Sequence, residues 1–373
     1  MFIAASGVYC LMSFFCAAEF FSQEREKKKE SFHPPVSILK PLKGTDPELR
    51  ENLRSFCRQD YPEYEVLLGF TDPDDPAIAA AEELAASEPG CSIRIVITRE
   101  VLGVNMKVTN LKGLLDAARY PLVAISDSDM RVEPDYLSRI VDEYHGGNTG
   151  LVTSLYKISK PSSAGAAFES LTIALDFIPS VLTARRLEGM TFGLGASMLF
   201  SKGALNDIGG ISAVADHLAD DYQIGNRLWK KGYRVILSDY VIEDVAGSMS
   251  IREYLKHQIR WARTYRACRP GGFLGYGITH LFPLSLLPLL VHGPTDSALA
   301  VPAAALALRL CLALLLCGKV IRKKSWLSWL PLIPLKDMMS FGIWAWSFMG
   351  KRVLWRGAYY TITRGGRMIR VPE

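Results

Sequence analysis

Two aspartates separated by one serine follow an apolar run in VAISDSDMRV (Val123–Val132). On an extended chain Asp127 and Asp129 point to the same side, so their charges repel unless a positive group lies between them. Taken alone, this D-x-D pattern leaves three interpretations open. The first is a loop cap, and the second is a calcium site. The third is a site where one or two carboxylates hold Mg²⁺ or Mn²⁺ and a substrate diphosphate supplies further ligands.

The surrounding sequence favours the last of these interpretations. The loop lacks the six or more oxygen ligands that a calcium site collects. No G-x-x-x-x-G-K-[ST] motif occurs in the chain, which excludes a P-loop NTPase on motif grounds. A diphosphate donor bound without a P-loop points to a nucleotide sugar.

The segments around these acids alternate between strand and helix patterns. Predicted strands lie within Pro35–Gly44, Tyr64–Asp75, Ser92–Thr98 and Pro121–Asp129, and predicted helices within Asp46–Asp60, Pro76–Ser87 and Lys107–Ala118. This alternation predicts an α/β fold with a parallel, doubly wound sheet, in which ligands bind at the carboxyl ends of the strands. A second acidic cluster, Asp72, Asp74 and Asp75, stands at such an end, as do Asp127 and Asp129.

Composition narrows the class of protein. The chain has 373 residues and a net charge of +5, which is too mild for a nucleic-acid binder, and we expect no nucleic-acid partner. Seven cysteines form no C-x-x-C pair, which indicates reduced thiols rather than a secreted disulfide framework. The slightly positive mean hydropathy indicates membrane segments.

Apolar runs at both ends predict an integral membrane protein. Met1–Phe21 is long enough to span a bilayer, and no basic region precedes it as in a signal peptide. Ala298–Leu316 and Gly271–Val291 are further candidate spans, whereas Trp326–Met349, which has basic flanks on both sides, fits a re-entrant or interfacial segment. We therefore expect an anchor (1–21), a catalytic domain (33–270), a C-terminal membrane region (271–350) and a basic cytosolic tail (351–373).

Positive charges predict the orientation. Basic clusters at Arg25–Lys29 and Lys319–Lys324, together with the basic tail, place the catalytic domain on the cytosolic side.

The order of motifs resembles that of the inverting nucleotide-sugar glycosyltransferases of the GT-A fold, which is Rossmann-like. It is most similar to the ceramide glucosyltransferase family, including bacterial relatives that glycosylate hopanoid lipids. The matching stretches are VSILKPLKGTDPEL, DYPEYEVLLGFTDPDDPAI, GVNMKVTNL, ISDSDMRVEPD, EGMTFGLGASMLFSK, LADDYQIGNRLWKKGYRV and HQIRW. They run from Val36 to Arg269, and WRGAYY (Trp355–Tyr360) matches more weakly.

The resemblance implies roles for individual residues. Donor-binding roles fall to Lys40, Asp72, Asp75, Lys107, Asn110, Asp127 and Arg260. Asp127 and Asp129 would orient Mg²⁺ or Mn²⁺ on the diphosphate, and the metal would stabilise UDP as it leaves. The alternative for Lys107, if the motif is set aside, is an ordinary lysine on the solvated face of a helix.

Asp221, in LADDYQIGNRL, matches the family's catalytic base. An inverting transfer needs one group that deprotonates the acceptor hydroxyl, and a carboxylate suits this role. The alternative is an acid that favours the helix dipole, a role that Asp220 could fill instead.

HQIRW (His257–Trp261) matches the family's (Q/R)xxRW box. Arg260 would stabilise charge on the departing diphosphate, and Trp261 would shape the floor beside acceptor and sugar. The alternatives are snorkelling for the arginine and aromatic-belt anchoring for the tryptophan. The box departs from the family at its first position, so either His257 makes the hydrogen bond in neutral form or Gln258 substitutes by a local shift. The resemblance implies an acceptor and sugar pocket formed by Gly195, Asp220, His257, Gln258 and Trp261.

Two apolar stretches complete the expected acceptor side. Gly189–Phe200, which contains Gly195, is either a pair of core strands or the wall that receives sugar and acceptor. Ala174–Met190 would lie near the bilayer and admit a lipid.

Together these features imply a transfer of glucose or N-acetylglucosamine from a UDP-sugar to the hydroxyl of ceramide or a hopanoid polyol, at the bacterial inner membrane. Partners would be the UDP-sugar, the lipid acceptor and the bilayer. A processive polysaccharide synthase of the same fold and a non-catalytic membrane scaffold remain as alternatives.

Overall fold

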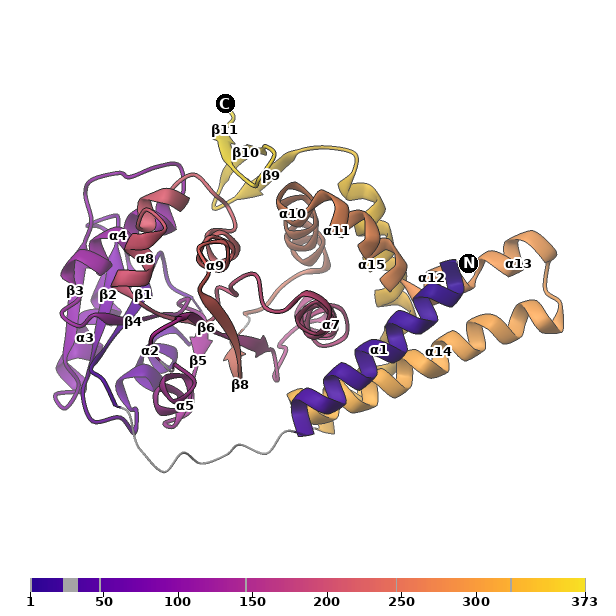
Figure 1. Ribbon diagram of the computed structural model, residues 1–373, viewed down its shortest axis with the longest axis horizontal. Helices are drawn as coiled ribbons and strands as arrows, with labels where there is room; N and C mark the ends of the chain where they lie inside the picture. The colour runs from indigo at the N-terminus through magenta and orange to yellow at the C-terminus, as the bar shows by residue number, and fades with distance from the viewer. Residues whose placement is uncertain are drawn as a thin grey trace. The chain divides into compact units, whose positions relative to one another are not determined.

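The computed structural model describes residues 2–22, 33–46, 48–144, 146–245, 247–322 and 324–372. The chain forms two compact units, coloured along the sequence in Figure 1. The sheet unit comprises Arg25–Tyr156 and Met190–Gly247, and the helical unit comprises Met1–Glu24, Lys157–Gly189 and Ser248–Glu373. The predicted 33–270 domain is therefore shared between them.

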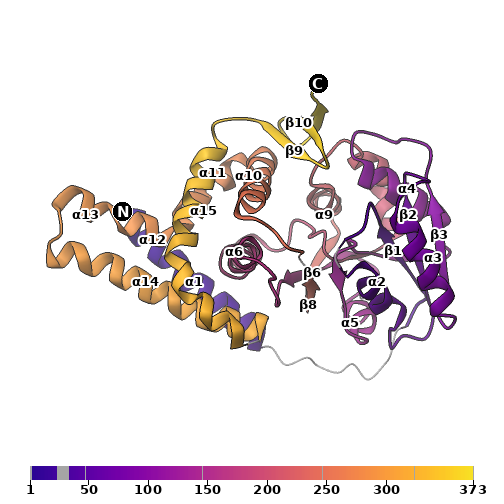
Figure 2. The ribbon, with the colours of Figure 1, turned by 180° about the vertical axis from the view of Figure 1, so that it is seen from behind.

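The sheet unit is built on eight strands in the order β3-β2-β1-β4-β7-β6-β8-β5 (Figures 1 and 2). Its first half is parallel, as predicted: β1 (Val36–Pro41) pairs with both β2 (Tyr64–Phe70) and β4 (Leu122–Ile125), and β3 (Ile93–Ile97) pairs with β2. The helices between these strands are α2 (Leu49–Cys57), α3 (Ala77–Ser87) and α4 (Met106–Ala117). This half therefore aligns the carboxyl ends of β1, β2 and β4.

The second half of the sheet is antiparallel, which corrects the prediction of a wholly parallel sheet. β7 (Met198–Ser201) runs antiparallel to both β4 and β6 (Thr149–Lys157), and β5 (Met130–Arg131) pairs antiparallel with β8 (Arg234–Asp244). The remaining elements are α5 (Tyr136–Asp142), α8 (Lys202–Asp207), η2 (Ile211–Val214) and α9 (Asp220–Lys230). Gly189–Phe200 thus contributes one strand and not a pair of strands.

The core of the sheet unit fixes the strands that carry the D-x-D stretch. Every residue of β1 and β4 is buried. Leu111 and Leu114 of α4 pack in one cluster with Leu39, Leu67 and Val123 of the sheet. Such fully buried strands are typical of a sheet covered on both faces.

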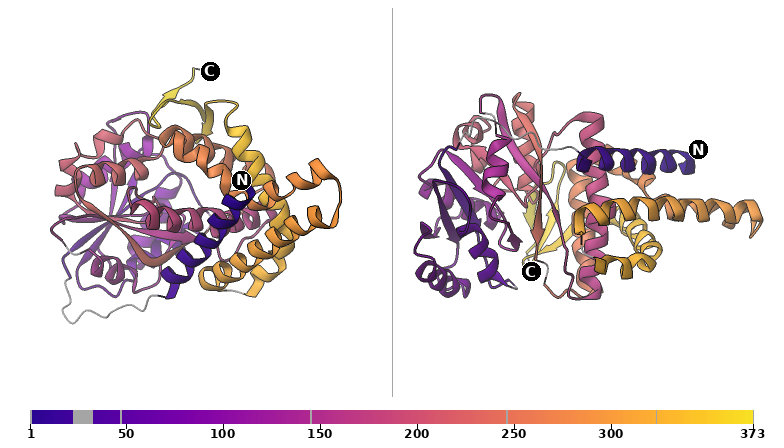
Figure 3. Two further views of the ribbon diagram at one scale, coloured as in Figure 1. Left: turned by 45° about the vertical axis from the view of Figure 1, so that its right-hand side comes forward. Right: turned by 90° about the horizontal axis from the view of Figure 1, so that it is seen from below.

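Helices make up most of the helical unit. They are α1 (Phe2–Ser22), α6 (Ala164–Thr172), η1 (Ile173–Phe177), α7 (Ile178–Glu188), α10 (Ile251–Cys268), α11 (Pro270–Gly275), η3 (Tyr276–Thr279), α12 (Leu281–Ser285), α13 (Leu287–His292), α14 (Asp296–Leu316), η4 (Cys317–Ile321), η5 (Lys324–Leu332) and α15 (Ile333–Ser347). η1 is a π-helical turn that continues α6 into α7. In Figure 3 the indigo α1 and the orange α14 run alongside each other.

Three helices among the described residues are long and apolar enough to cross a membrane: Phe2–Ser22, Ala164–Glu188 and Asp296–Ile321. The protein buries 83% of the apolar window in Ala164–Glu188 but only 28% in each of the other two. The apolar character of α6 and α7 therefore serves packing inside the unit, whereas α1 and α14 present apolar surface outward. Pro270–Thr279 and Leu281–His292 pass the same test as a pair bent by 59°. Trp326–Met349 is not among these candidates.

The basic tail folds as a small antiparallel sheet of β9 (Arg352–Trp355), β10 (Ala358–Ile362) and β11 (Met368–Arg370). Arg263 of α10 donates to the Arg352 carbonyl, and the Gly365 amide donates to the Ala267 carbonyl at 3.0 Å. The tail is thus fixed to α10. The predicted cluster at Arg25–Lys29 lies outside the described residues.

Candidate active site

The D-x-D stretch forms a turn at the carboxyl end of β4. The strand ends at Ile125, and the Met130 amide donates to the Asp127 carbonyl at 3.3 Å. The premise that both aspartates point to one side of an extended chain is therefore wrong. The turn arises because β5 begins at Met130 and pairs with β8, so the chain must leave the direction of β4.

The positive group beside the first aspartate is Lys107. Its Nζ lies 2.5 Å from Asp127 Oδ1 and 4.0 Å from Asp220 Oδ2. Asn105 caps α4 by accepting from the Lys107 and Val108 amides, which sets the start of the helix. Burial alone would lower the pKa of Lys107, but Asp127 and Asp220 outweigh it and raise that pKa. Lys107 is thus a firmly charged bridge between two acidic segments.

Lys40 supports the turn from inside the core. Its side chain is fully buried, Nζ donates to the Asp127 carbonyl and lies 3.5 Å from Ser126 Oγ, and the ammonium is 3.7 Å from the centroid of the Phe56 ring. Burial lowers the pKa of Lys40 to about 7, against the opposing charges of Asp129 and Asp127. Lys40 thus holds the turn that carries Asp127, and its assignment to the donor stays a prediction.

Asp129 keeps an unused oxygen. Within the described residues, Oδ1 is buried without a hydrogen-bond partner. Burial and then the charges of Asp127 and Asp46 raise the pKa of Asp129 to about 6, while Lys40 opposes them. Asp46 accepts from Ser128 Oγ, a contact that sequence reasoning missed.

Asp220 and Asp221 open α9, where a helix dipole favours acids. Asp220 is buried, and burial is the main cause of its raised pKa. Asp221 Oδ2 accepts from the Gly195 amide and Oδ1 from the Tyr222 amide, both at 2.7 Å. Burial and then the charge of Asp220 raise the pKa of Asp221 to about 6, opposed by Lys107.

The loop before β7 and helix α9 approach each other through glycines. A Cβ on Gly225 would lie 2.0 Å from the Gly193 amide nitrogen, and one on Gly193 would lie 2.7 Å from the Asp221 carbonyl oxygen. Only glycine permits this approach at Gly225, because backbone atoms stand in the way of any side chain. The contact holds the Gly195 amide against the Asp221 carboxylate.

Three other predicted donor residues make local contacts. Asp75 accepts from the Gly44 amide with both oxygens, at 3.0 and 2.9 Å, and Asp72 accepts from the Asp74 amide at 3.0 Å on the exposed loop. Asn110 donates to the carbonyls of Leu42 and Gly69 at 3.3 and 2.8 Å, joining the ends of β1 and β2. Asp75 and Asn110 thus order the loops at this edge of the sheet.

The HQIRW residues lie on α10 of the helical unit. A capping box between Ser250 and Glu253 starts this helix. The His257 and Trp261 rings are 5.0 Å apart, and Trp261 lies 6.0 Å from Phe177 of η1. Arg260 is partly buried. These residues belong to the other unit from Asp127 and Asp221.

Glu169 of α6 contacts both His257 and Gln258, the two residues considered for the first position of the box. His257 Nδ1 lies 3.0 Å from Glu169 Oε1, and Gln258 Nε2 lies 3.0 and 2.9 Å from Oε1 and Oε2. His257 and Gln258 therefore bond the same carboxylate together, and which of them takes the family's role at this position stays open. Sequence reasoning missed Glu169, although a lone acid within an apolar helix is a recognisable signal.

In chemical terms, the sheet unit gathers carboxylates on two segments around one lysine. Asp127 and Asp129 stand at the end of β4, and Asp220 and Asp221 open α9. Lys107 reaches both groups. This arrangement offers anionic ligands for a cation and a separate carboxylate able to accept a proton.

Comparison with known proteins gives consistent results. The chain is 28% identical over 302 residues to ceramide glucosyltransferase 3 of Caenorhabditis elegans, covering 76% of this chain and 66% of that protein. It is 30% identical over 238 residues to ceramide glucosyltransferase 1 of the same organism, covering 64% and 51%. The chain thus spans about half to two thirds of the length of these relatives.

The fold has a solved counterpart. A mannosyltransferase, PcManGT from Pyrobaculum calidifontis, in complex with GDP-Man and Mn²⁺, superimposes with a TM-score of 0.54 at 20% identity. The match covers 93% of this chain and 99% of that one. This likeness confirms the predicted GT-A fold. A family model, glycosyl transferase family 21, matches residues 1–368, and the chain belongs to this family.

Proposed function

We propose that this protein transfers a sugar from a UDP-sugar to the hydroxyl group of a membrane lipid in a single, inverting displacement. The observation that carries the proposal is the grouping of Asp221 with the Lys107–Asp127 pair at the carboxyl end of the sheet. Relatives named ceramide glucosyltransferases and the outward apolar surfaces of α1 and α14 support a lipid acceptor. Glucose or N-acetylglucosamine, and ceramide or a hopanoid polyol, fit this proposal.

A divalent cation fits the carboxylates at the end of β4. The described residues contain no group of three or more His, Cys, Asp or Glu side chains that could hold a metal alone. Mg²⁺ and Mn²⁺ are commonly bound through one or two carboxylates plus substrate phosphates, and the unpartnered Oδ1 of Asp129 beside Asp127 suits that mode. When bound, the ion supplies Lewis-acid stabilisation of the departing diphosphate.

The protein's own residues supply the remaining roles. Asp221, held by the Gly195 amide, accepts the proton of the acceptor hydroxyl. Among the described residues each of its oxygens accepts one hydrogen bond, from the Gly195 or the Tyr222 amide, which leaves lone pairs for this proton. Lys107 holds Asp127 in place, and Lys40 holds the turn below it. Arg260 and Trp261 are proposed to serve the leaving diphosphate and the acceptor.

Radioactive transfer distinguishes the alternatives. Purified full-length protein incubated with a UDP-[¹⁴C]sugar and a lipid extract is expected to give one labelled lipid band. A labelled polymer would support a processive synthase, and no product would support a scaffold.

Carboxylate variants test the donor site. Asp127→Ala and Asp129→Ala are each expected to abolish transfer and to weaken metal-dependent UDP binding. Asp116→Ala, which removes an exposed carboxylate from α4, is the matched control and is expected to retain transfer. Full activity in EDTA would remove the metal from the mechanism.

A further inference from the structure

Glu169 is a buried acid on an apolar helix. Only 3% of its surface is exposed, and its neighbours on α6 include Phe168 and Ser170, both buried. A buried carboxylate is costly unless it is hydrogen-bonded. Here the bonds come from two consecutive residues of α10, His257 and Gln258.

These bonds determine which histidine nitrogen carries the proton. An ionised carboxylate can only accept hydrogen bonds, and the Gln258 amide already donates to both of its oxygens. His257 Nδ1, 3.0 Å from Oε1, must therefore carry the hydrogen. In the neutral ring this leaves the lone pair on Nε2, just as a carboxylate orients histidine in other sites.

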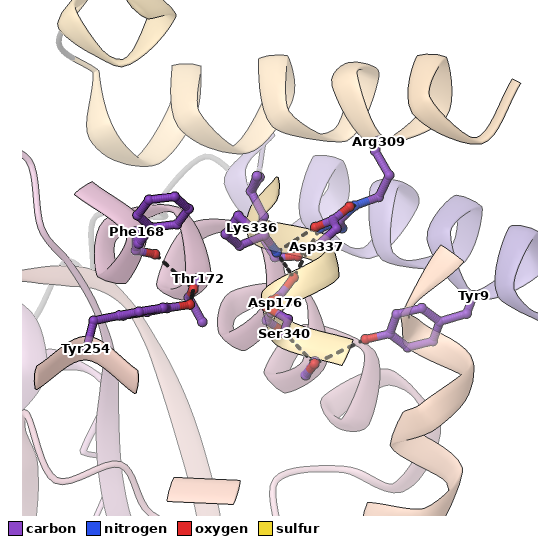
Figure 4. Close-up of polar contacts among 11 residues, drawn as sticks. Tyr9, Phe168, Thr172, Asp176, Tyr254, Arg309, Lys336, Asp337 and Ser340 are labelled. Carbon is purple, nitrogen blue, oxygen red and sulfur yellow. Dashed lines mark hydrogen bonds and ion pairs between the residues drawn. The ribbon is translucent and has the colours of Figure 1, made fainter. Parts of the chain in front are cut away.

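The helix that carries Glu169 is fixed in register against α10. Thr172 Oγ1 and Tyr254 Oη are 2.9 Å apart, one turn from the Glu169 contacts. Figure 4 shows this tie, together with Asp176 of η1, which accepts from Lys336 at 2.6 Å and from Arg309 at 3.1 Å. α6 and η1 are thus anchored at Thr172 and at Asp176, both on the C-terminal side of Glu169.

The surroundings of His257 suit an amphipathic partner. Its side chain is 27% exposed, and no hydrogen bond to Nε2 occurs among the described residues. The Trp261 ring lies 5.0 Å from the His257 ring and 6.0 Å from the Phe177 ring. An aromatic wall beside a hydrogen-bond acceptor fits a hydroxyl group on an apolar molecule. The lone pair on Nε2 would repel the oxygens of a diphosphate, so this position does not suit the sugar donor.

We infer that Glu169 is a positioning residue, which holds His257 in the tautomer whose Nε2 accepts a hydrogen bond from a hydroxyl of the lipid acceptor other than the one that gives its proton to Asp221. This inference rests on the proposed function for the identity of the hydroxyl. It adds to the expected acceptor role of His257 the atom that makes the contact, Nε2, and the residue that orients the ring, Glu169.

The tautomer is measured without any transfer reaction. Full-length protein with ¹⁵N-labelled histidine rings contains six histidines, and His257→Gln identifies the signal of interest by its loss. At about pH 9, where imidazole is neutral, we expect the proton of His257 on Nδ1. In Glu169→Leu the acceptor is removed and nothing holds the proton on Nδ1, so we expect the tautomer with the proton on Nε2 to appear. A wild-type proton on Nε2, or no change in Glu169→Leu, would overturn the inference.

The KM values for acceptor and donor show which of the two substrates bonds to Nε2 of His257. His257→Phe keeps an aromatic ring but removes the lone pair, and it is expected to raise the acceptor KM about threefold to tenfold, the worth of one hydrogen bond. The donor KM should stay within about twofold. A raised donor KM with an unchanged acceptor KM would assign His257 to the diphosphate and refute the inference. Lys256→Gln, at the exposed neighbouring position, is the control.

A double-variant comparison separates positioning from a structural role. His257→Gln restores an acceptor atom that needs no tautomer, so its acceptor KM should stay near wild type. Glu169→Leu should then raise the acceptor KM in the wild-type background but change it less than about twofold in the His257→Gln background. An equal loss in both backgrounds would make Glu169 merely structural. If the wild-type protein transfers no sugar at all, the proposed function fails, and the tautomer measurement still decides the role of Glu169.

Discussion

At the scale of single residues, the carboxylate of Asp221 decides the reaction. Asp221→Asn removes its basicity, and we expect kcat to fall by about 10²–10⁴ while UDP binding survives. Both oxygens accept backbone hydrogen bonds, so the new NH₂ must face one N–H group, and stability should fall by about 1–3 kcal/mol. Asp220→Asn, which leaves Gly195 bonded to Asp221, should reduce kcat less. Near-normal turnover in Asp221→Asn with a loss in Asp220→Asn would move the base back by one residue.

The pH profile of kcat should follow the same carboxylate. Burial, and then Asp220, raise the pKa of Asp221 to about 6, with Asp127 acting in the same direction and Lys107 opposing. Only the unprotonated carboxylate accepts a proton, so activity should persist above about pH 6 and fall about tenfold per pH unit below it. UDP binding measured over the same range serves as the control. A kcat that stays flat down to pH 5, or that falls only in step with UDP binding, would argue against this role.

The places of the acids in the fold could be predicted from the sequence because their motifs are local. Asp127, Asp129 and Asp221 stand at recognisable strand and helix boundaries. The burial of Lys40 beneath the turn could not be predicted, because it depends on contacts between distant segments. Glu169 was missed because its partners lie 88 and 89 residues further along the chain.

At the scale of elements, the contact between α9 and the loop before β7 depends on one missing side chain. Gly225→Ala would place a methyl group 2.0 Å from the Gly193 amide nitrogen, so we expect the unfolding free energy to fall by about 1–3 kcal/mol or more. Gly203→Ala on α8 meets nothing closer than 3.8 Å and should be neutral or stabilising by up to about 1 kcal/mol. Denaturant or thermal unfolding of the two variants makes the comparison. Equal stabilities of the two variants would show that the loop before β7 moves to make room for the added methyl group.

The ion cluster of the helical unit should be a second determinant of stability. Arg309 donates to Asp337 at 2.8 and 2.6 Å, and Lys336 lies 2.7 Å from Asp337, all three being buried (Figure 4). Arg309→Leu leaves an excess negative charge inside the unit, which typically costs about 3–5 kcal/mol. We expect a clearly lower midpoint of thermal unfolding in detergent.

Leu314→Ala is the matched control for Arg309→Leu, because this side chain on the same helix is 51% exposed and should matter little. An Arg309→Leu protein as stable as Leu314→Ala would show that the cluster contributes no net stability.

Element prediction succeeded where the chain alternates regularly. The parallel strands β1 to β4 and their helices follow the hydrophobic pattern closely. The antiparallel half was not predicted, because β7 has only four residues and pairs with strands far away in sequence. The tail sheet was missed because its basic residues obscure the alternation.

At the scale of the whole molecule, the testable property is the side of the membrane on which the acids lie. Basic residues around Lys319 and in the tail predict a cytosolic sheet unit. Protease added to sealed right-side-out bacterial vesicles should leave this unit intact and should digest it after the vesicles are opened. Digestion in sealed vesicles would invert the proposed topology.

The place of β7 in the sheet has a consequence for synthesis on the ribosome. β7 lies between β4 and β6, and it is made after both of them and after the apolar segment Lys157–Gly189. At 5–20 residues per second, the interval from Ile125 to Ser201 lasts about 4–15 s. During that time the free edge of β4 is a template for aggregation. A nascent chain of this protein therefore passes through an interval in which that edge is unpaired, and the interval ends only when β7 emerges.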